Sequence, residues 1–187
     1  MNPTLSKNKS YTKQIVIAAM LTAFSIIIPM LPFKLPLPQP FSVTLASHVP
    51  TIVAMFISPW VAVCTVIGST IGFLISVSPI VAIRAASHIV FAVTGALLLK
   101  KRCNPYVVLL VCAILHGLFE ALMVIWFGPL FGFTQDMLTA QYIWGTVFGI
   151  TIFHHCIDCL LSVILLVALE KAKFIKDTRL LPAKVKQ

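Results

Sequence analysis

Residues 106–126 read YVVLLVCAILHGLFEALMVIW, an apolar run that contains only one basic and one acidic side chain, His116 and Glu120. A helix that spans a bilayer needs about 20 predominantly apolar residues. The run does not show the period-two alternation that is typical of a membrane β-strand. The stretch therefore predicts a transmembrane helix that carries two polar groups into the membrane.

The composition of the whole chain also indicates a membrane protein. Hydrophobic residues make up 59% of its 187 residues and charged residues only 10%, whereas soluble domains have about 45–50% and about 25%. The mean hydropathy is +1.02. A soluble chain of this size has too little interior to bury so much apolar surface. At roughly 30 residues for each span with its connection, the length allows six helices.

We expect an all-α integral membrane protein with a single membrane domain, residues 1–187, built as a bundle of six transmembrane helices. The stretch 32–40 contains four prolines and cannot be helical. Pro59 and Pro79 mark two further breaks in the apolar sequence. The predicted spans are about 14–31, 42–57, 60–76, 80–99, 106–126 and 141–169.

The basic residues are clustered at the ends of the predicted spans. Three precede the first span, three form the loop 100–102 and six lie in the tail after residue 170. With six spans, all of these fall on one side of the membrane, and such an excess of Lys and Arg marks the cytoplasmic side. We therefore expect both termini to be cytoplasmic in a multi-pass protein of a bacterial plasma membrane. This clustering of basic residues on the cytoplasmic side of a lipid bilayer explains the net charge of +9, so we expect no nucleic-acid partner.

Ionisable side chains inside the spans are candidate site residues, because such groups are costly in a membrane and usually functional. The topology places His48, Arg84 and Glu120 in the outer part of the membrane. It places His88 and His116 one helical turn deeper on their helices. The guanidinium of Arg84 suits a ligand carboxylate, although Glu120 is an equally good partner for a buried ion pair. Each histidine has the alternative of being a hydrogen-bonded core residue.

A second polar group, residues 154–159, reads His-His-Cys-Ile-Asp-Cys. Its side chains could bind a soft metal ion with help from another helix, but small residues such as Cys are also common where membrane helices pack. We expect neither a metal nor another cofactor. The sequence also has no Walker A motif, nucleotide loop, HExxH pair or activated nucleophile. It therefore predicts a transport protein without its own ATPase rather than an enzyme.

Two pairs of small residues have the four-residue spacing that lets helices approach closely. Ala19 and Ala23 lie on the first predicted span, and Gly68 and Gly72 lie on the third. From spacing alone, ordinary packing within the bundle is the favoured interpretation of both pairs.

Taken together, these features resemble the substrate-specificity (S) component of an energy-coupling factor (ECF) transporter, the vitamin-uptake branch of the ABC transporters. The resemblance covers essentially the whole chain, through its size, six spans, basic termini and alanine pair. It implies that Ala19 and Ala23 dock on the membrane-embedded T subunit, which works with two ATPase subunits. It also implies that the loop of residues 32–41 covers a substrate pocket in the outer half of the protein.

Within that family, the stretches 42–50, 54–59 and 79–92 resemble the niacin-type members. The pantothenate-type members carry a lysine-bearing turn where this chain has Ser58-Pro59-Trp60. The resemblance therefore implies nicotinate, a small aromatic ring with a carboxylate, as the substrate. Another vitamin such as pantothenate, or a metal permease that uses residues 154–159, remains the alternative.

Nicotinate needs a cation for its carboxylate, a polar partner for its ring nitrogen and apolar walls for the ring. We expect Arg84 to hold the carboxylate, and Glu120 or a histidine to hold the ring nitrogen. The candidate substrate-binding residues are His48, Arg84, His88 and Glu120, with Phe41, Tyr142 and Trp144 as aromatic walls.

Overall fold

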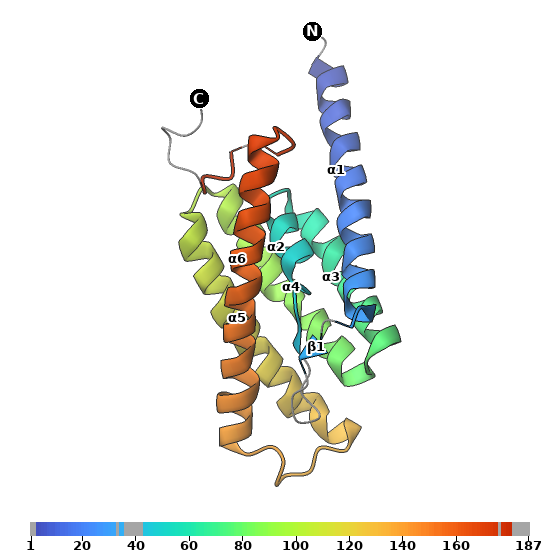
Figure 1. The fold of residues 1–187 in the computed structure, drawn as a ribbon, viewed down its shortest axis with the longest axis vertical. Helices are drawn as coiled ribbons and strands as arrows, with labels where there is room; N and C mark the ends of the chain where they lie inside the picture. The colour runs from blue at the N-terminus through green and yellow to red at the C-terminus, as the bar shows by residue number, and fades with distance from the viewer. Residues whose placement is uncertain (1–2, 33, 36–42, 176, 181–187) are drawn as a thin grey trace.

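The computed structural model describes residues 3–32, 34–35, 43–175 and 177–180. Its helices run side by side in one bundle, and the start of α1 lies at the same end of the bundle as the end of α6 (Figure 1). The helices are α1 (Pro3–Ile27), α2 (Val49–Met55), α3 (Pro59–Ser76), α4 (Pro79–Lys100), α5 (Pro105–Phe127) and α6 (Gly149–Lys171). The shorter elements are η1 (Ile28–Met30), η2 (Gly128–Phe131), the π-helical segment η3 (Gln141–Phe148), β1 (Lys34–Leu35) and β2 (Val43–Thr44).

Five helices among the described residues are long and apolar enough to cross a membrane. The bounds of these helices lie within a few residues of the spans predicted at 14–31, 60–76, 80–99, 106–126 and 141–169. The chain is therefore an all-helical, multi-pass membrane protein. The five spans are Tyr11–Met30, Pro59–Ser76, Pro79–Lys100, Pro105–Phe131 and Gln141–Lys171.

The predicted helix at 42–57 is wrong, because of the described residues 43–57 only Val49–Met55 form a helix. Val43 and Thr44 instead pair as β2 with β1, antiparallel. Ala46 then adopts a left-handed backbone conformation with φ 64°, which a continuous right-handed helix does not allow. Pro50 lies in the first turn of α2, where a proline is tolerated because its missing N–H is not needed.

Three of the long helices begin in the same way, with a small polar residue followed by proline. Ser58, Ser78 and Asn104 have extended backbones and precede the first residues of α3, α4 and α5. The Asn104 side chain accepts a hydrogen bond from the backbone N–H of Tyr106 at 2.9 Å, and Ser58 accepts one from Val61. Such N-caps satisfy N–H groups that the first helical turn leaves unpaired. These signals explain why the predicted boundaries of these helices are accurate.

Helices α1 and α3 run parallel and almost in contact. A Cβ added at Gly68 would lie 2.8 Å from the carbonyl oxygen of Thr22, and one added at Gly72 would lie 2.6 Å from that of Ile26. Contact pairs advance together along the two helices, as the hydrogen bond from Ser76 to the Pro29 carbonyl shows one turn further on. The glycine pair therefore serves packing inside the bundle, as its spacing predicted.

Since α1 and α3 are parallel, the chain between them has to return through the bundle. Residues 43–58, with β2 and the short α2, make this return (Figure 1). All residues of α2 from Pro50 to Met55 are buried, against α3, α4 and α6 among others. His48 is the N-cap residue of this helix, so the short helix places an imidazole in the middle of the bundle.

Candidate functional site

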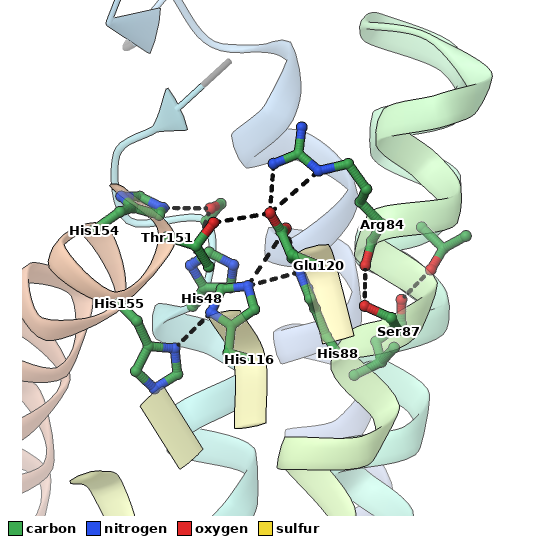
Figure 2. A network of polar contacts seen from close by, with 12 residues as sticks. His48, Arg84, Ser87, His88, His116, Glu120, Thr151, His154 and His155 are labelled. Atoms are coloured by element: carbon green, nitrogen blue, oxygen red, sulfur yellow. Dashed lines mark hydrogen bonds and ion pairs between the residues drawn. The ribbon is translucent and has the colours of Figure 1, made fainter. Parts of the chain in front are cut away.

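The five histidines of the chain meet in the interior, around the N-terminus of α2. His48 precedes α2, His88 lies on α4, His116 on α5, and His154 and His155 on α6; all five are buried. The ring of His48 lies 4.4 Å from that of His116, 4.7 Å from that of His88 and 4.8 Å from that of His154, between ring centroids. Figure 2 shows the cluster together with Arg84 and Glu120.

Arg84 and Glu120 form a buried ion pair between α4 and α5. The Nε of Arg84 lies 3.2 Å from Oε2 of Glu120, and Nη2 donates to the same oxygen. Thr151 on α6 also donates to Oε2, at 3.0 Å. The two charged residues are only 5% and 6% exposed. The ion pair that the sequence left as an alternative is therefore present, and one carboxylate oxygen takes all of these donors (Figure 2).

The other oxygen of Glu120 faces two imidazoles. Oε1 lies 3.3 Å from Nε2 of His88 and 3.4 Å from Nε2 of His116. These two nitrogens are themselves 3.1 Å apart. Behind them, Nδ1 of His116 lies 2.9 Å from Nδ1 of His155. A chain of polar contacts thus runs from Arg84 through Glu120 into the histidine cluster.

Asp158 on α6 fixes the backbone that carries His48. Its Oδ1 accepts a hydrogen bond from the backbone N–H of Ala46 at 2.9 Å, and its Oδ2 accepts one from that of His48 at 3.0 Å. Oδ2 also lies 2.9 Å from Nδ1 of His48. An ionised carboxylate can only accept, so Nδ1 of His48 carries the proton. This contact joins residues 110 positions apart and orients the His48 ring.

Asp158, Thr151 and His154 were not among the predicted substrate-binding residues. A spacing signal was available on α6, where His154, Asp158 and Ser162 recur every four residues and all are buried. That spacing places them on one face of a helix. The predicted polar group 154–159 is contiguous in sequence, so it combines this buried face with residues such as Cys156, which is exposed.

A small cavity of about 30 Å³ lies between these side chains. It is lined by four of the predicted substrate-binding residues, which the fold brings together from the start of α2, from α4 and from α5. Those four are His48, Arg84, His88 and Glu120, and the remaining polar lining comes from Thr44, Ser47, His116, Thr151 and His154. This volume accommodates about one water molecule, so any larger ligand requires the cavity walls to move apart.

Two of the three predicted aromatic walls, Tyr142 and Trp144, lie outside the cavity lining. Tyr142 is partly buried and packs in an apolar cluster with Val124 and its neighbours. Trp144 is 49% exposed, with its ring 5.7 Å from that of Phe148. Neither residue lines the cavity. Phe41, together with most of the predicted covering loop 32–41, lies outside the described residues.

The alanine and cysteine pairs take different positions. Ala19 and Ala23 are exposed on α1, so they face away from the helices that pack against it. Cys156 is exposed and Cys159 partly buried. Among the described residues, the groups with metal-ligand spacing include His48–His88–His116 and His48–His154–Asp158. The cysteines of residues 154–159 are in neither group.

Comparison with known proteins gives one curated relative. The chain is 45% identical over 95 residues to the niacin transporter NiaX of Lactococcus lactis subsp. cremoris (strain MG1363). The match covers 50% of this chain and 42% of that protein, so the chain spans about two fifths of the relative's length. No protein-family model matches the chain, and no solved structure matches it significantly. The chain is homologous to a niacin transporter over half its length, which confirms the resemblance read from the sequence.

Proposed function

We propose that this protein is the substrate-binding S component of an ECF transporter and that its substrate is nicotinate. The observation that carries this proposal is the buried cation Arg84 in a polar cavity of a multi-pass protein that is homologous to a niacin transporter. The homology supports nicotinate as the substrate, and the position of Arg84 in the cavity supports this place for the nicotinate carboxylate. Transport, rather than chemistry on the substrate, is the proposed role.

Recognition of nicotinate would use charge at one end and hydrogen bonding at the other. The carboxylate suits the guanidinium of Arg84, which binds planar anions through paired N–H donors. Because Arg84 already contacts Glu120, the ligand either shares the guanidinium or displaces the Glu120 side chain from it. The ring nitrogen is a hydrogen-bond acceptor, and the imidazole N–H groups of the cluster are suitable donors.

Access to the cavity would involve the segment that precedes β2. Val43 and Thr44 of β2 line the cavity, and they directly follow residues 36–42. We propose that residues 32–41 cover the bound substrate, as the family resemblance implies. A cavity of about 30 Å³ is too small for a pyridine ring, so substrate entry would require the cavity walls to move apart.

The exposed pair Ala19 and Ala23 on α1 is the proposed contact with the T subunit, which two ATPase subunits would drive. The contrast with Gly68 and Gly72 supports this assignment, because the glycine pair already provides the close packing of α1 on α3. Small residues on an outward face permit another helix to approach closely. The alanine pair is thus available for a partner in the membrane.

The proposed orientation has both termini in the cytoplasm. The loop after α4 contacts the segment after α6, since Arg102 lies 3.4 Å from Asp177 and Arg179 donates to the Cys103 carbonyl. Two of the three basic clusters therefore lie at one end of the bundle, and the start of α1 lies at that end too (Figure 1). This distribution supports the positive-inside assignment.

Co-expression with an ECF module tests the proposal. The tagged wild-type chain should co-purify with a T subunit and two ATPases, and cells should take up labelled nicotinate. Ala19→Trp and Ala23→Trp should abolish uptake and co-purification while the purified variants still bind nicotinate. The matched control is Ile114→Trp on α5, a position that is also exposed but lies on another helix. Loss of uptake in this control, or normal uptake in both alanine variants, would contradict the docking face.

A further inference from the structure

We propose that His88, His116 and Glu120, together with His48, form a binding site for a divalent transition-metal ion of the zinc class. This inference goes beyond the proposed transport function and departs from the absence of a metal expected from the sequence. It places an ion at the inner end of the cavity, on nitrogen and oxygen ligands. The cysteines of residues 154–159 take no part in it.

The spacing of three ligand atoms carries the proposal. Nε2 of His88, Nε2 of His116 and Oε1 of Glu120 form a triangle with sides of 3.1, 3.3 and 3.4 Å. Zinc binds imidazole nitrogen at about 2.0–2.1 Å and carboxylate oxygen at about 2.0–2.2 Å in tetrahedral geometry, which separates neighbouring ligand atoms by about 3.4 Å. The three atoms therefore already have the mutual distances of one face of a zinc tetrahedron.

His48 supplies the fourth ligand. The ligand atoms of His48, His88 and His116 all lie within 4.8 Å of one another. Because Nδ1 of His48 donates to Asp158, its Nε2 is the nitrogen with a free lone pair in the neutral ring. A carboxylate behind a metal-binding histidine is the usual device that fixes its tautomer and orientation. Asp158 would have this role here.

The two carboxylate oxygens of Glu120 have different partners, and this difference leaves one of them available to a metal ion. Arg84 and Thr151 bond to Oε2, which leaves Oε1 directed at the two imidazoles (Figure 2). Without an ion, a proton on Nε2 of one imidazole can form a good hydrogen bond either with Oε1 of Glu120 or with the other imidazole, but not with both. Protons on both Nε2 atoms would place two N–H groups face to face. A shared cation satisfies all three lone pairs.

The burial and charge of the site also support a bound divalent metal ion. His88, His116 and Glu120 are buried, and their imidazole and carboxylate donors suit zinc and its neighbours in the first transition row. The cavity volume of about 30 Å³ suits an ion with a water molecule. With Arg84, a divalent ion would exceed the charge of Glu120 and Asp158 by one, which one anionic ligand in the cavity would neutralise.

Metal analysis of the purified full-length chain in detergent tests the site. After chelation and dialysis against Zn²⁺, we expect one zinc per chain by elemental analysis, and Co²⁺ should give the intense visible absorption of tetrahedral coordination. X-ray absorption of the wild-type zinc form should show only nitrogen and oxygen neighbours. This measurement needs no variant, so it tests the site even where substitutions prevent folding.

Variants then assign the ligands. His88→Ala/His116→Ala should abolish stoichiometric binding, and Asp158→Asn should weaken it by roughly 10–100-fold, the usual cost of losing such a supporting carboxylate. The control Cys156→Ala/Cys159→Ala should bind like the wild type. Absence of stoichiometric zinc, sulfur neighbours, or unchanged binding in a folded double-histidine variant would overturn the inference. Nicotinate binding is measured separately, so its failure would overturn the proposed substrate and leave the metal result standing.

Discussion

Arg84→Gln removes the cation proposed to hold the nicotinate carboxylate, but by itself it also strands Glu120. The two side chains are 5% and 6% exposed, and breaking such a buried pair from one side costs about 3–5 kcal/mol of stability. The informative comparison is therefore Glu120→Gln against Arg84→Gln/Glu120→Gln. Both proteins lack the carboxylate, so their difference reports on the guanidinium alone.

The expected magnitude follows from the bonds that the guanidinium would make. Hydrogen bonds to a charged group contribute about 1.5–3 kcal/mol. Since about 1.4 kcal/mol is a factor of ten, the double variant should bind nicotinate roughly 10- to 150-fold more weakly than Glu120→Gln does. Nicotinamide has no carboxylate, so it should bind the wild type less well than nicotinate and lose less in the double variant.

Isothermal titration of both ligands against the purified proteins measures these differences, with thermal unfolding as the check on folding. Arg102→Gln is the control, because this arginine side chain is 76% exposed and its contact with Asp177 lies far from the cavity. Its nicotinate affinity should equal that of the wild type. Equal losses for the acid and the amide in a folded double variant would refute the role of Arg84 in binding the carboxylate.

Three further predictions concern packing, the cysteines and the covering loop. Gly72→Ala should destabilise the protein by about 1–3 kcal/mol, since its Cβ would meet the Ile26 backbone; Gly145→Ala, whose Cβ meets nothing within 4 Å, should unfold like the wild type in a thermal melt. Cys156→Ala/Cys159→Ala should leave nicotinate uptake near normal. A large loss of uptake in this variant would show that these thiols take part in transport. Hydrogen exchange in residues 32–41 should slow on nicotinate binding. Unchanged exchange in protein saturated with nicotinate would contradict the proposal that this loop covers the substrate.

The apolar runs of the sequence were sufficient to predict five of the six helices. Three of the long helices, α3, α4 and α5, begin with a small polar residue such as Asn104 followed by proline, and these signals are local. The segment 42–57 was not predictable in the same way. Its backbone at Ala46 and His48 is held by Asp158, more than 100 positions away. Such a tertiary contact leaves no trace in the hydropathy of the segment itself.

The candidate site, too, was predictable from the sequence only in part. Depth along each span predicted that His48, Arg84, His88 and Glu120 lie near one another, and all four line the cavity. Which way a side chain faces depends on the rotation of its helix. Trp144 was expected at the pocket, yet its ring lies against Phe148 on a half-exposed face.

Equilibrium binding of labelled nicotinate to the purified wild-type chain tests the central claim most directly. The proposal predicts saturable binding of one nicotinate per chain, displaced by excess unlabelled nicotinate and much less effectively by nicotinamide or pantothenate. Absence of saturable nicotinate binding by folded protein, or tighter binding of pantothenate, would contradict it.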